Sequence, residues 1–393
     1  MKSTKGYQNV IYLDNSATSW PKPTEVSEAM VYFLAGIGAN PGRSGHQLAA
    51  ESSRMVYTAR ERICSLFNAP DPLRLAFTKN ITEAINLVLH GFLKVGDHVI
   101  TTSMEHNSVM RPLRALEAVG VELSVVNCTP DGLLDPLDVE KAIRSNSRLV
   151  VINHSSNVNG TLQPISEIGQ IIRKYNLLLL VDTAQSAGKV RIDMTNDHID
   201  ILAFTGHKSL MGPMGTGGVI FGKRVDTLQI DPLIRGGTGS RSEEEFQPVF
   251  MPDVFESGTL NAVGISGLSA GVDWILAKGV DTIREHEVAL TQQLLDGLRR
   301  IPNVNVYCSQ DAQMNTGTIA FNINAMTPSE VGLYLDEDFG ILSRVGLHCA
   351  PAAHKTIGTF PGGSVRFGVG IFNTSQEIDT AIQAVTQISK GAG

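Results

Sequence analysis

The sequence predicts an α/β fold in which a mainly parallel sheet of seven strands forms a large domain, with a smaller α+β domain at the C-terminal end. Between about residues 70 and 222, short apolar runs alternate with helical patterns, and this alternation is typical of a parallel sheet covered by helices. The chain has 393 residues, which is too long for one small core, so two domains are expected. The seven strand-like runs are 73–77, 98–102, 121–126, 148–153, 177–182, 199–204 and 218–221.

Other elements complete the predicted large domain. Residues 10–14 form a strand-like stretch that can join either domain. In the segment 82–93, Ile85, Val88 and Leu89 share one face with Phe92, which predicts a helix. Residues 231–261 are glycine-rich and then acidic, so we expect a long loop there, on the surface or against a partner subunit.

The C-terminal part predicts the smaller domain. A helical pattern at 264–276 is followed by strand-like runs at 317–322 and 364–369 around a helical segment at 329–336. We expect a large domain at 16–262 and a small domain formed by 1–15 and 263–393.

Composition excludes several classes of protein. With 42% hydrophobic and 18% charged residues the chain is expected to be globular, and its net charge of −7 argues against a general nucleic-acid binder. No apolar run is long enough to cross a membrane and residues 1–9 are polar, so a cytoplasmic location is expected. The cysteines are widely spaced and indicate neither a disulfide framework nor a zinc site; they are Cys64, Cys128, Cys308 and Cys349.

A lysine at the end of a buried strand is the first candidate for chemistry. Lys208 closes the turn Thr205-Gly206-His207-Lys208 directly after the apolar run 201–204, and Asp182 closes the run 177–181. Ligands of parallel sheets bind beyond the carboxyl ends of the strands. A lysine that forms a Schiff base and a carboxylate that keeps the ring nitrogen protonated are what pyridoxal phosphate requires. Taken alone, Lys208 would be read as a surface lysine at the end of a strand; its neighbours favour the other interpretation.

Two turns are suited to the phosphate of such a cofactor. Thr205 and His207 offer donors, and Gly206 allows the backbone to come close to a ligand. At Ile81-Thr82 a helix starts directly after a strand, and free backbone N–H groups at a helix start bind anions. Alone, this second turn is compatible with a simple helix cap.

Other polar residues follow the predicted strands but are ambiguous by themselves. Gln185 follows Asp182 and can bond the phenolic oxygen of the cofactor or cap a helix. His106 starts a helix, where it can stack on a planar ring and move protons, or face solvent. Asn157 follows another strand and is equally open to either interpretation.

A glycine-bearing loop carries an unusual cysteine. Cys349 lies in the segment 344–351, between a histidine and a small residue, which is not typical core packing; near cations its thiolate would be a nucleophile. A metal site formed by His348, Cys349 and His354 has too few ligands at no known spacing. Arg366 stands in a strand-like run of apolar neighbours, as half of a buried ion pair or as a fork for a substrate carboxylate.

These residues resemble the class V, fold-type I pyridoxal phosphate enzymes, and within them the cysteine desulfurases and selenocysteine lyases of the SufS-like group. The resemblance runs from Tyr12-Leu13-Asp14-Asn15-Ser16-Ala17-Thr18 to Phe372-Asn373-Thr374. Its most specific motifs are Asp182-Thr183-Ala184-Gln185-Ser186, Thr205-Gly206-His207-Lys208 and the segment 344–351.

The resemblance implies roles for individual residues. Lys208 would carry the cofactor as a Schiff base, Arg366 would take the substrate carboxylate, and Cys349 would receive the sulfur. The ring would be held by Asp182, Gln185 and His106, and the phosphate by Ile81, Thr82, Thr205 and His207. The resemblance further implies a homodimer in which Thr259 reaches the phosphate of the neighbouring subunit. Asn157 and Arg344 are expected at the substrate, and His46, in Arg43-Ser44-Gly45-His46, is a further substrate-site candidate.

Three departures from the family pattern bear on specificity. Leu347 stands where histidine is usual, Asn80-Ile81 replace Gly-Thr, and Gly42 replaces a common histidine. Backbone N–H groups can still hold the phosphate, whereas the altered cysteine loop leaves the substrate and the sulfur acceptor open. The short interval between Cys349 and Arg366 resembles the short-loop group.

The expected reaction converts L-cysteine to L-alanine and leaves a persulfide on Cys349, with selenocysteine as a possible substrate and an acceptor protein as a possible partner. Lys208 removes the Cα proton and Asp182 keeps the ring protonated. Another class V reaction, such as C–S β-elimination, racemisation or transamination, and a weakly active sulfur-relay scaffold are the alternatives.

Overall fold

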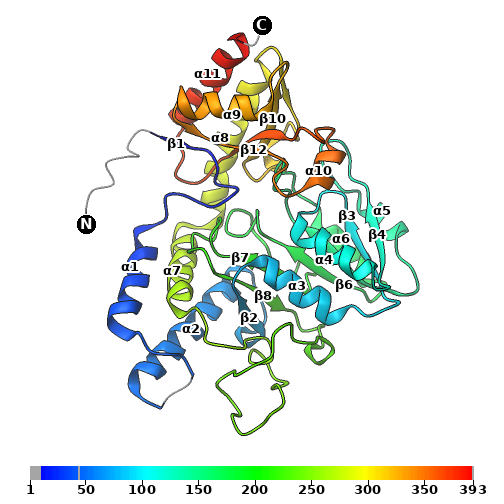
Figure 1. The fold of residues 1–393 in the computed structure, drawn as a ribbon, viewed down its shortest axis with the longest axis vertical. Helices are drawn as coiled ribbons and strands as arrows, with labels where there is room; N and C mark the ends of the chain where they lie inside the picture. Colours follow the sequence, from blue (N-terminus) through cyan, green and yellow to red (C-terminus); the bar gives the residue numbers. More distant parts are fainter. Residues whose placement is uncertain (1–9, 43–44, 392–393) are drawn as a thin grey trace.

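The computed structural model describes residues 10–42 and 45–391. A seven-stranded sheet dominates the fold, in the order β2-β8-β7-β6-β5-β3-β4 (Figure 1). All neighbouring strands are parallel except β8, which runs antiparallel to both β2 and β7. The mainly parallel seven-stranded sheet is therefore confirmed. Its strands are β2 (Leu75–Thr78), β3 (His98–Thr102), β4 (Glu122–Val126), β5 (Ser147–Asn153), β6 (Leu178–Asp182), β7 (Ile201–Thr205) and β8 (Gly217–Phe221).

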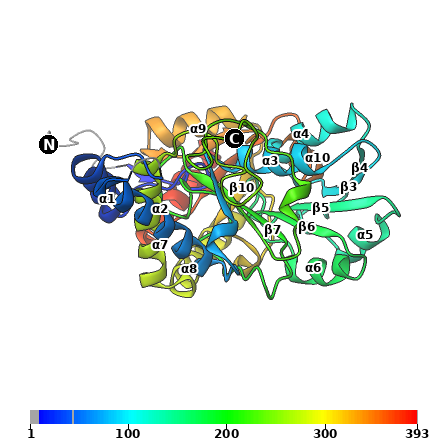
Figure 2. The ribbon, with the colours of Figure 1, turned by 90° about the horizontal axis from the view of Figure 1, so that it is seen from below.

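Helices bury both faces of this sheet. Val150 and Leu179 point into one core, together with side chains of α2 (Gln47–Leu66), α6 (Ile165–Arg173) and α7 (Ala262–Lys278). Their chain neighbours Val151 and Leu180 point into the opposite core, with side chains of α3 (Ile81–Phe92) and α4 (Asn107–Glu117). Figure 2 shows α3 and α4 on one side of the strands and α6 on the other. Burial on both faces explains why the central strands are continuous apolar runs rather than alternating ones.

A second sheet lies at the top of the molecule in Figure 1. It has the order β12-β13-β10-β9, with antiparallel neighbours. A separate apolar core joins it to the helices beside it. The strands are β9 (Val304–Val306), β10 (Thr318–Ile323), β12 (Arg344–Gly346) and β13 (Ser364–Gly368), and the helices are α8 (Val280–Arg299), α9 (Pro328–Glu337) and α11 (Ser375–Gly391).

Both ends of the described chain contribute to this second unit. The N-terminal strand β1 (Ile11–Tyr12) pairs in parallel with β11 (Ile341–Leu342), and Asp14 forms a bridge to Gly368. The 10–14 stretch therefore joins the small unit. The predicted division into 16–262 and 1–15 with 263–393 stays a prediction. The side chains of α7 pack on the large sheet, whereas α8 contributes Ile283 to the core of the large sheet and Leu290 and Leu294 to that of the small one.

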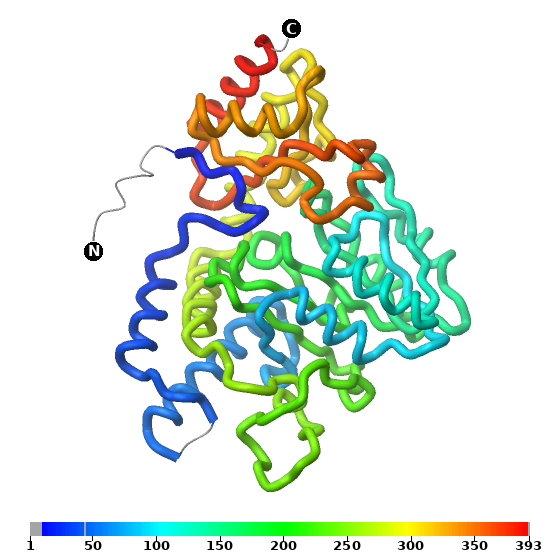
Figure 3. The backbone as a smooth tube through the Cα atoms, in the orientation of Figure 1, coloured from blue at the N-terminus to red at the C-terminus, as the bar shows by residue number. Residues whose placement is uncertain are grey.

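The segment 231–261 contains no helix or strand, as the sequence predicts. Figure 3 shows it projecting at the end of the molecule opposite the small sheet. No helix within the described ranges is long and apolar enough to cross a membrane. The remaining elements are α1 (Thr24–Tyr32), a π-helical turn (Phe33–Ile37), α5 (Pro136–Lys141), α10 (Pro351–Thr356) and 3-10 turns at Pro72–Arg74, Thr227–Gln229 and Ala312–Met314.

Candidate active site

A polar cavity of about 160 Å³ lies where β5, β6 and β7 end. Asn153 pairs with Asp182 and Asp182 with Ala203, so the carboxyl ends of three parallel strands meet there. Nine of the predicted site residues line the cavity: Ile81, Thr82, His106, Asn157, Asp182, Gln185, Thr205, His207 and Lys208. The structure therefore brings these residues together at one edge of the sheet, and their roles stay predictions.

Lys208 and Asp182 face one cavity from adjacent strands. Burial lowers the pKa of the Lys208 amine to about 8, although the Asp182 charge acts in the opposite direction. Burial raises the pKa of the Asp182 carboxyl, opposed by a 2.8 Å hydrogen bond from Ala184 N–H and by the charge of Lys208. An amine with a lowered pKa is more often neutral, and only the neutral amine can attack a carbonyl or accept a proton.

His106 is held in one orientation at the start of α4. Its Nδ1 accepts a hydrogen bond from Ser108 N–H at 3.0 Å and lies 2.7 Å from Ser108 Oγ. Burial lowers the pKa of the ring to about 4, and the nearby Lys208 and Arg344 charges act in the same direction. The neutral ring with Nδ1 as acceptor carries its proton on Nε2. Thr82 Oγ1 bonds Ser108 Oγ at 3.0 Å, so the two predicted residues are connected through a serine.

Unsatisfied donors mark the anion end of the cavity. Thr205 Oγ1 and His207 Nδ1 are buried, and within the described chain neither has a hydrogen-bond partner. The start of α3 at Ile81 lines the same cavity, and its N-cap Asn80 accepts from Glu83 N–H at 3.0 Å. The first N–H groups of the helix have no intrahelical partner. Buried polar groups without partners are rare, so these donors fit a phosphate group that the chain itself does not supply.

Gly206 is required for a reason that the sequence did not reveal. A Cβ atom at this position would lie 2.1 Å from Thr216 Oγ1 and 3.1 Å from Leu268 Cδ1. The glycine therefore permits close packing of the turn against neighbouring protein atoms, rather than an approach to the ligand.

Asn157 connects the cavity to the small sheet. Its backbone oxygen accepts from Arg366 Nη1 at 2.9 Å, while its side-chain Nδ2 donates to His348 O at 2.7 Å. Gln185 is also predicted at the cofactor, and its Nε2 donates a hydrogen bond to Ser16 O at 2.9 Å. Asn157 thus lies between the predicted carboxylate site and the cysteine loop.

Arg366 forms a buried ion pair, one of the two roles that the sequence left open, and keeps one donor unpartnered. Its Nη2 pairs with Asp14 Oδ1 at 2.7 Å, and only 1% of its side chain is exposed. Its Nε is buried and has no partner within the described residues. Arg344 stands directly opposite Arg366 on the neighbouring strand. The ion pair fixes one part of the guanidinium, and the Nε–H remains as a donor for a carboxylate.

Cys349 lies at the surface, between β12 and α10, and does not line the cavity. It and His348 both adopt positive φ, 57° and 48°. The Cys349 carbonyl accepts from Asn107 N–H at 2.9 Å, directly after His106. His348 is neutral near pH 7, because burial and the Arg366 charge lower its pKa to about 2. The loop is therefore fastened by its backbone to both the His106 helix and Asn157.

Comparison with known proteins agrees with this geometry. A model of the aminotransferase class-V family matches residues 11–380. The chain belongs to this family.

Its class-V relatives are named as cysteine desulfurases. A probable cysteine desulfurase of Methanothermobacter thermautotrophicus is 36% identical, with 96% of this chain and 94% of the relative covered. One from Pyrococcus abyssi is 33% identical, with coverage of 98% and 95%. The apo structure of a cysteine desulfurase from Thermococcus onnurineus has a TM-score of 0.91 at 32% identity, and covers 97% of this chain and 95% of its own. The fold-type I expectation is confirmed.

Two predicted residues lie elsewhere in this class-V chain. His46 is exposed and caps α2, accepting from Ala49 N–H at 3.2 Å; the preceding Arg43 and Ser44 are outside the described residues. Thr259 is exposed beside a different cavity, which Thr78 and Lys79 also line. Neither contributes to the cofactor cavity of the same chain.

Sequence reasoning did not assign five residues that line the cavity, nor Asp14, which pairs with Arg366; the five are Asn80, Ser108, Asn153, Ser155 and Ala184. Ser108 carried a usable signal, because a serine in the first helical turn beside a candidate histidine can bond its ring. Asp14 carried none, since its place against Arg366 depends on a bridge to Gly368 across the whole chain length. No group of three metal-ligating side chains occurs in the ranges that the structure describes.

Proposed function

We propose that the protein is a cysteine desulfurase that converts L-cysteine to L-alanine and leaves the sulfur as a persulfide on Cys349. The observation that best supports this function is that the Cys349 loop is hydrogen-bonded to the rest of the chain at two places. Asn157 bonds both this loop and Arg366, and Asn107 bonds the Cys349 carbonyl beside His106. A surface cysteine unrelated to the reaction has no need of backbone bonds to the carboxylate site and the cofactor cavity at once.

Pyridoxal phosphate fits the residues that line the cavity. Lys208 would hold its aldehyde carbon, Asp182 its ring nitrogen, and Thr205 and His207 its phosphate, through donors that are otherwise unpartnered. The neutral His106 ring would lie against the plane of the cofactor. When bound, pyridoxal phosphate supplies a ring that withdraws electrons from the Cα of an amino acid.

The chain's own residues would perform three tasks on the substrate. Arg366 binds the carboxylate through its unpartnered Nε–H. Lys208, whose pKa burial lowers to about 8, moves the proton at Cα. The Cys349 thiolate attacks the substrate sulfur, the C–S bond breaks, and the β-carbon gains a proton to give alanine. The sulfur atom remains bound to Cys349, so no outside oxidant or reductant is needed.

Product identification tests this function. Purified protein loaded with pyridoxal phosphate is given L-cysteine and a reducing thiol, and alanine and sulfide are measured together. We expect equal amounts of both, a loss of roughly a hundredfold or more in Cys349→Ala, and nearly full activity in the matched control Cys128→Ala. Full activity in Cys349→Ala rejects the persulfide step. Pyruvate with ammonia in place of alanine identifies the β-elimination alternative.

Substrate range is part of the same proposal. Leu347, where the resembling group usually has histidine, directly precedes His348 and Cys349. A selenocysteine lyase would retain activity on selenocysteine in Cys349→Ala while losing activity on cysteine. The same assay with both amino acids therefore separates the two substrates.

Assembly and location complete the proposal. We place the enzyme in the cytoplasm as a homodimer, with Thr259 of each subunit at the phosphate of the other, and with an acceptor protein that removes the sulfur. The exposure of Thr259 supports this, because it lies outside the cavity of its own chain. Sedimentation measurements determine whether the protein is a monomer or a dimer in solution. Mixing Thr259→Ala with Lys208→Ala subunits tests the shared site, because hybrid dimers then hold one site with both native residues.

A further inference from the structure

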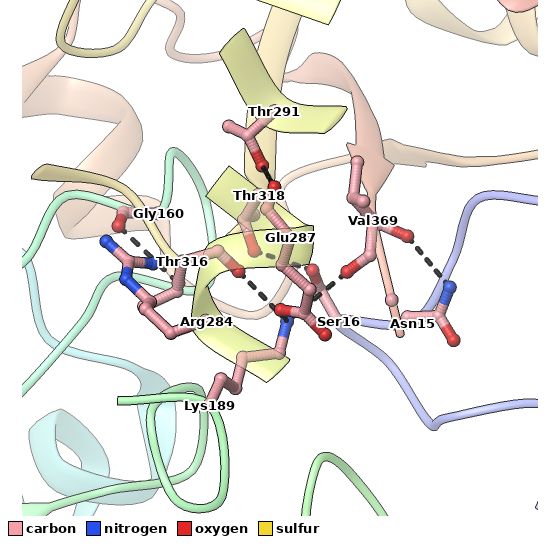
Figure 4. Close-up of polar contacts among 12 residues, drawn as sticks. Asn15, Ser16, Gly160, Lys189, Arg284, Glu287, Thr291, Thr316, Thr318 and Val369 are labelled. Carbon is pink, nitrogen blue, oxygen red and sulfur yellow. Dashed lines mark hydrogen bonds and ion pairs between the residues drawn. The ribbon is translucent and has the colours of Figure 1, made fainter. Parts of the chain in front are cut away.

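A buried lysine outside the cavity joins the two sheets. Lys189 is 3% exposed in its side chain, and its ammonium lies 3.0 Å from the carboxylate of Glu287, which is 1% exposed (Figure 4). The same ammonium donates to Thr316 O at 3.0 Å and Val369 O at 3.3 Å. Two of the three ammonium protons are thus donated to backbone carbonyls, and the charge is paired with Glu287.

The partners of Lys189 flank the strand that carries Arg366. Val369 directly follows β13, and its N–H donates to Gly317 O at 2.7 Å, next to Thr316. Arg366 stands three residues before Val369 on this strand. The Lys189 ammonium therefore fixes the end of β13 through backbone carbonyls and Glu287, rather than through any substrate contact.

Lys189 lies in the segment that follows β6, and residues earlier in this segment line the cavity. It follows Asp182 and Gln185 on a compact turn, in which Ser186 N–H and Ala187 N–H both donate to Thr183 O and Lys189 N–H donates to Ser186 O. This hydrogen-bonded turn makes a short, stiff connection. It links Asp182 and Gln185, which are proposed to hold the cofactor ring, to β13, the strand that carries Arg366.

Stability alone does not explain a buried pair here. Taking two charges out of water is costly, and apolar side chains of similar volume are often as stabilising. Glu287 is poorly satisfied: among the described residues neither of its oxygens has a hydrogen bond of good geometry, and Lys189 is its ion-pair partner. What an apolar pair could not provide is a donor to two strand-end carbonyls.

We propose that Lys189 is a positioning residue for substrate binding, which sets the place of Arg366 relative to the cofactor cavity, while Glu287 balances its charge. The inference rests on the proposed function, since it assigns Arg366 to the substrate carboxylate. It predicts that loss of Lys189 weakens binding of the amino acid without changing how the cofactor is held.

The test compares Lys189→Met with Arg191→Met. Arg191 bonds Asp281 at the start of the same helix, α8, at 2.5 Å, but this pair is exposed. For Lys189→Met we expect the KM for L-cysteine to rise about tenfold with kcat changed less than about twofold, and the visible absorbance of the bound cofactor to stay unchanged. Arg191→Met is expected to match the wild type.

A double variant separates positioning from stability. In Lys189→Met/Glu287→Leu no buried charge is left unpaired, so the melting temperature should recover. The strand-end carbonyls still lack their donor, so the raised KM should persist. A wild-type KM in the double variant, or in Lys189→Met with only a lower melting temperature, overturns the proposal.

Two further measurements identify the route. In an Arg366→Ala background, Lys189→Met should raise KM no further, because the effect acts through Arg366; an additional tenfold rise contradicts it. Titration of the cofactor absorbance with L-alanine reports amino-acid affinity without desulfuration. If the wild type forms no alanine from cysteine, the proposed function fails, while the alanine affinity of Lys189→Met still decides the role of Lys189.

Discussion

Two parts of the protein differ in how the rest of the chain holds them. One is the cavity floor, formed by Asp182, Thr205, His207 and Lys208, and the other is the loop that carries Cys349. The floor residues stand at the ends of buried parallel strands, with Asp182 4% exposed between two neighbours of the sheet. Cys349 is exposed, follows a short strand, and has positive φ. Its loop is hydrogen-bonded to Asn107 and Asn157 through its backbone, and His348 Nε2 lies 3.3 Å from Ser364 Oγ.

This difference separates two kinds of chemistry. Proton transfer at Cα needs a lysine whose pKa and position are fixed, and burial within a sheet provides both. Sulfur transfer needs a thiol that meets the substrate and then an acceptor outside the protein. A loop at the surface, fastened near the cavity, can serve both encounters.

Replacing Lys208 should have the largest effect. We expect Lys208→Ala to lower the rate of alanine formation by about a thousandfold or more, because the general base at Cα is lost. Persulfide on Cys349, read by mass spectrometry, should disappear with it. Persulfide formed from cysteine in Lys208→Ala would show that Cys349 takes sulfur from the substrate without the help of Lys208.

Replacing Asn157 should sharpen the comparison, because this residue connects the two regions. In Asn157→Ala the donor to His348 O is lost, whereas the backbone acceptor for Arg366 is kept. We expect persulfide formation to slow about tenfold while cofactor absorbance and the exchange of the Cα proton with solvent change little. Equal losses in proton exchange and persulfide formation would mean that Asn157 serves the floor instead.

The rate of cofactor uptake should depend on pH through the pKa of Lys208. Only the neutral Lys208 amine attacks the aldehyde, and its pKa is lowered from 10.5 to about 8. Protein freed of cofactor should therefore recover visible absorbance faster as the pH rises to about 8, with a plateau above it. Because the Asp182 charge raises the pKa of Lys208, Asp182→Asn should move the plateau to lower pH. A rate that still rises near pH 10 contradicts the lowered pKa.

The smallest effect concerns Glu105, a fully buried carboxyl that directly precedes His106 in the sequence. Burial, against hydrogen bonds from Thr102 and Asn153, raises its pKa from 4.5 to about 8. The folded protein then holds a proton that the unfolded chain releases between these values, so stability falls as the pH rises through this window.

Glutamine cannot lose that proton. The melting temperature of Glu105→Gln, relative to the wild type, should therefore rise by a few degrees between pH 5 and 8 and level off above pH 8. The exposed Glu167→Gln is the control. A difference that does not change with pH means that Glu105 is ionised in the fold.

The floor could be predicted from the sequence because its information is local. Each residue follows a recognisable apolar run, as Asp182 follows 177–181, and parallel strand ends meet at one edge. Its unsatisfied donors Thr205 and His207 were found for the same reason.

The rest depended on contacts between distant parts of the chain. The Asp14–Arg366 pair, the two bonds of Asn157 and the Lys189 ammonium each join segments more than a hundred residues apart. No spacing in a single sequence reports these pairings. The sequence thus placed Arg366 in a buried run, and could not decide between its ion pair and its free donor.

The small unit joins segments that lie far apart in the described chain, because Asp14 bridges Gly368, and this sets an order of events during synthesis. Domains form as the chain leaves the ribosome from its N-terminus. All seven strands of the large sheet are made by Phe221, whereas β13 and Arg366 come near the end. Asp14 is among the earliest residues made and must wait for its partner until nearly the whole chain exists. The strands that lead to Asp182 and Lys208 are therefore made well before β13, which carries Arg366.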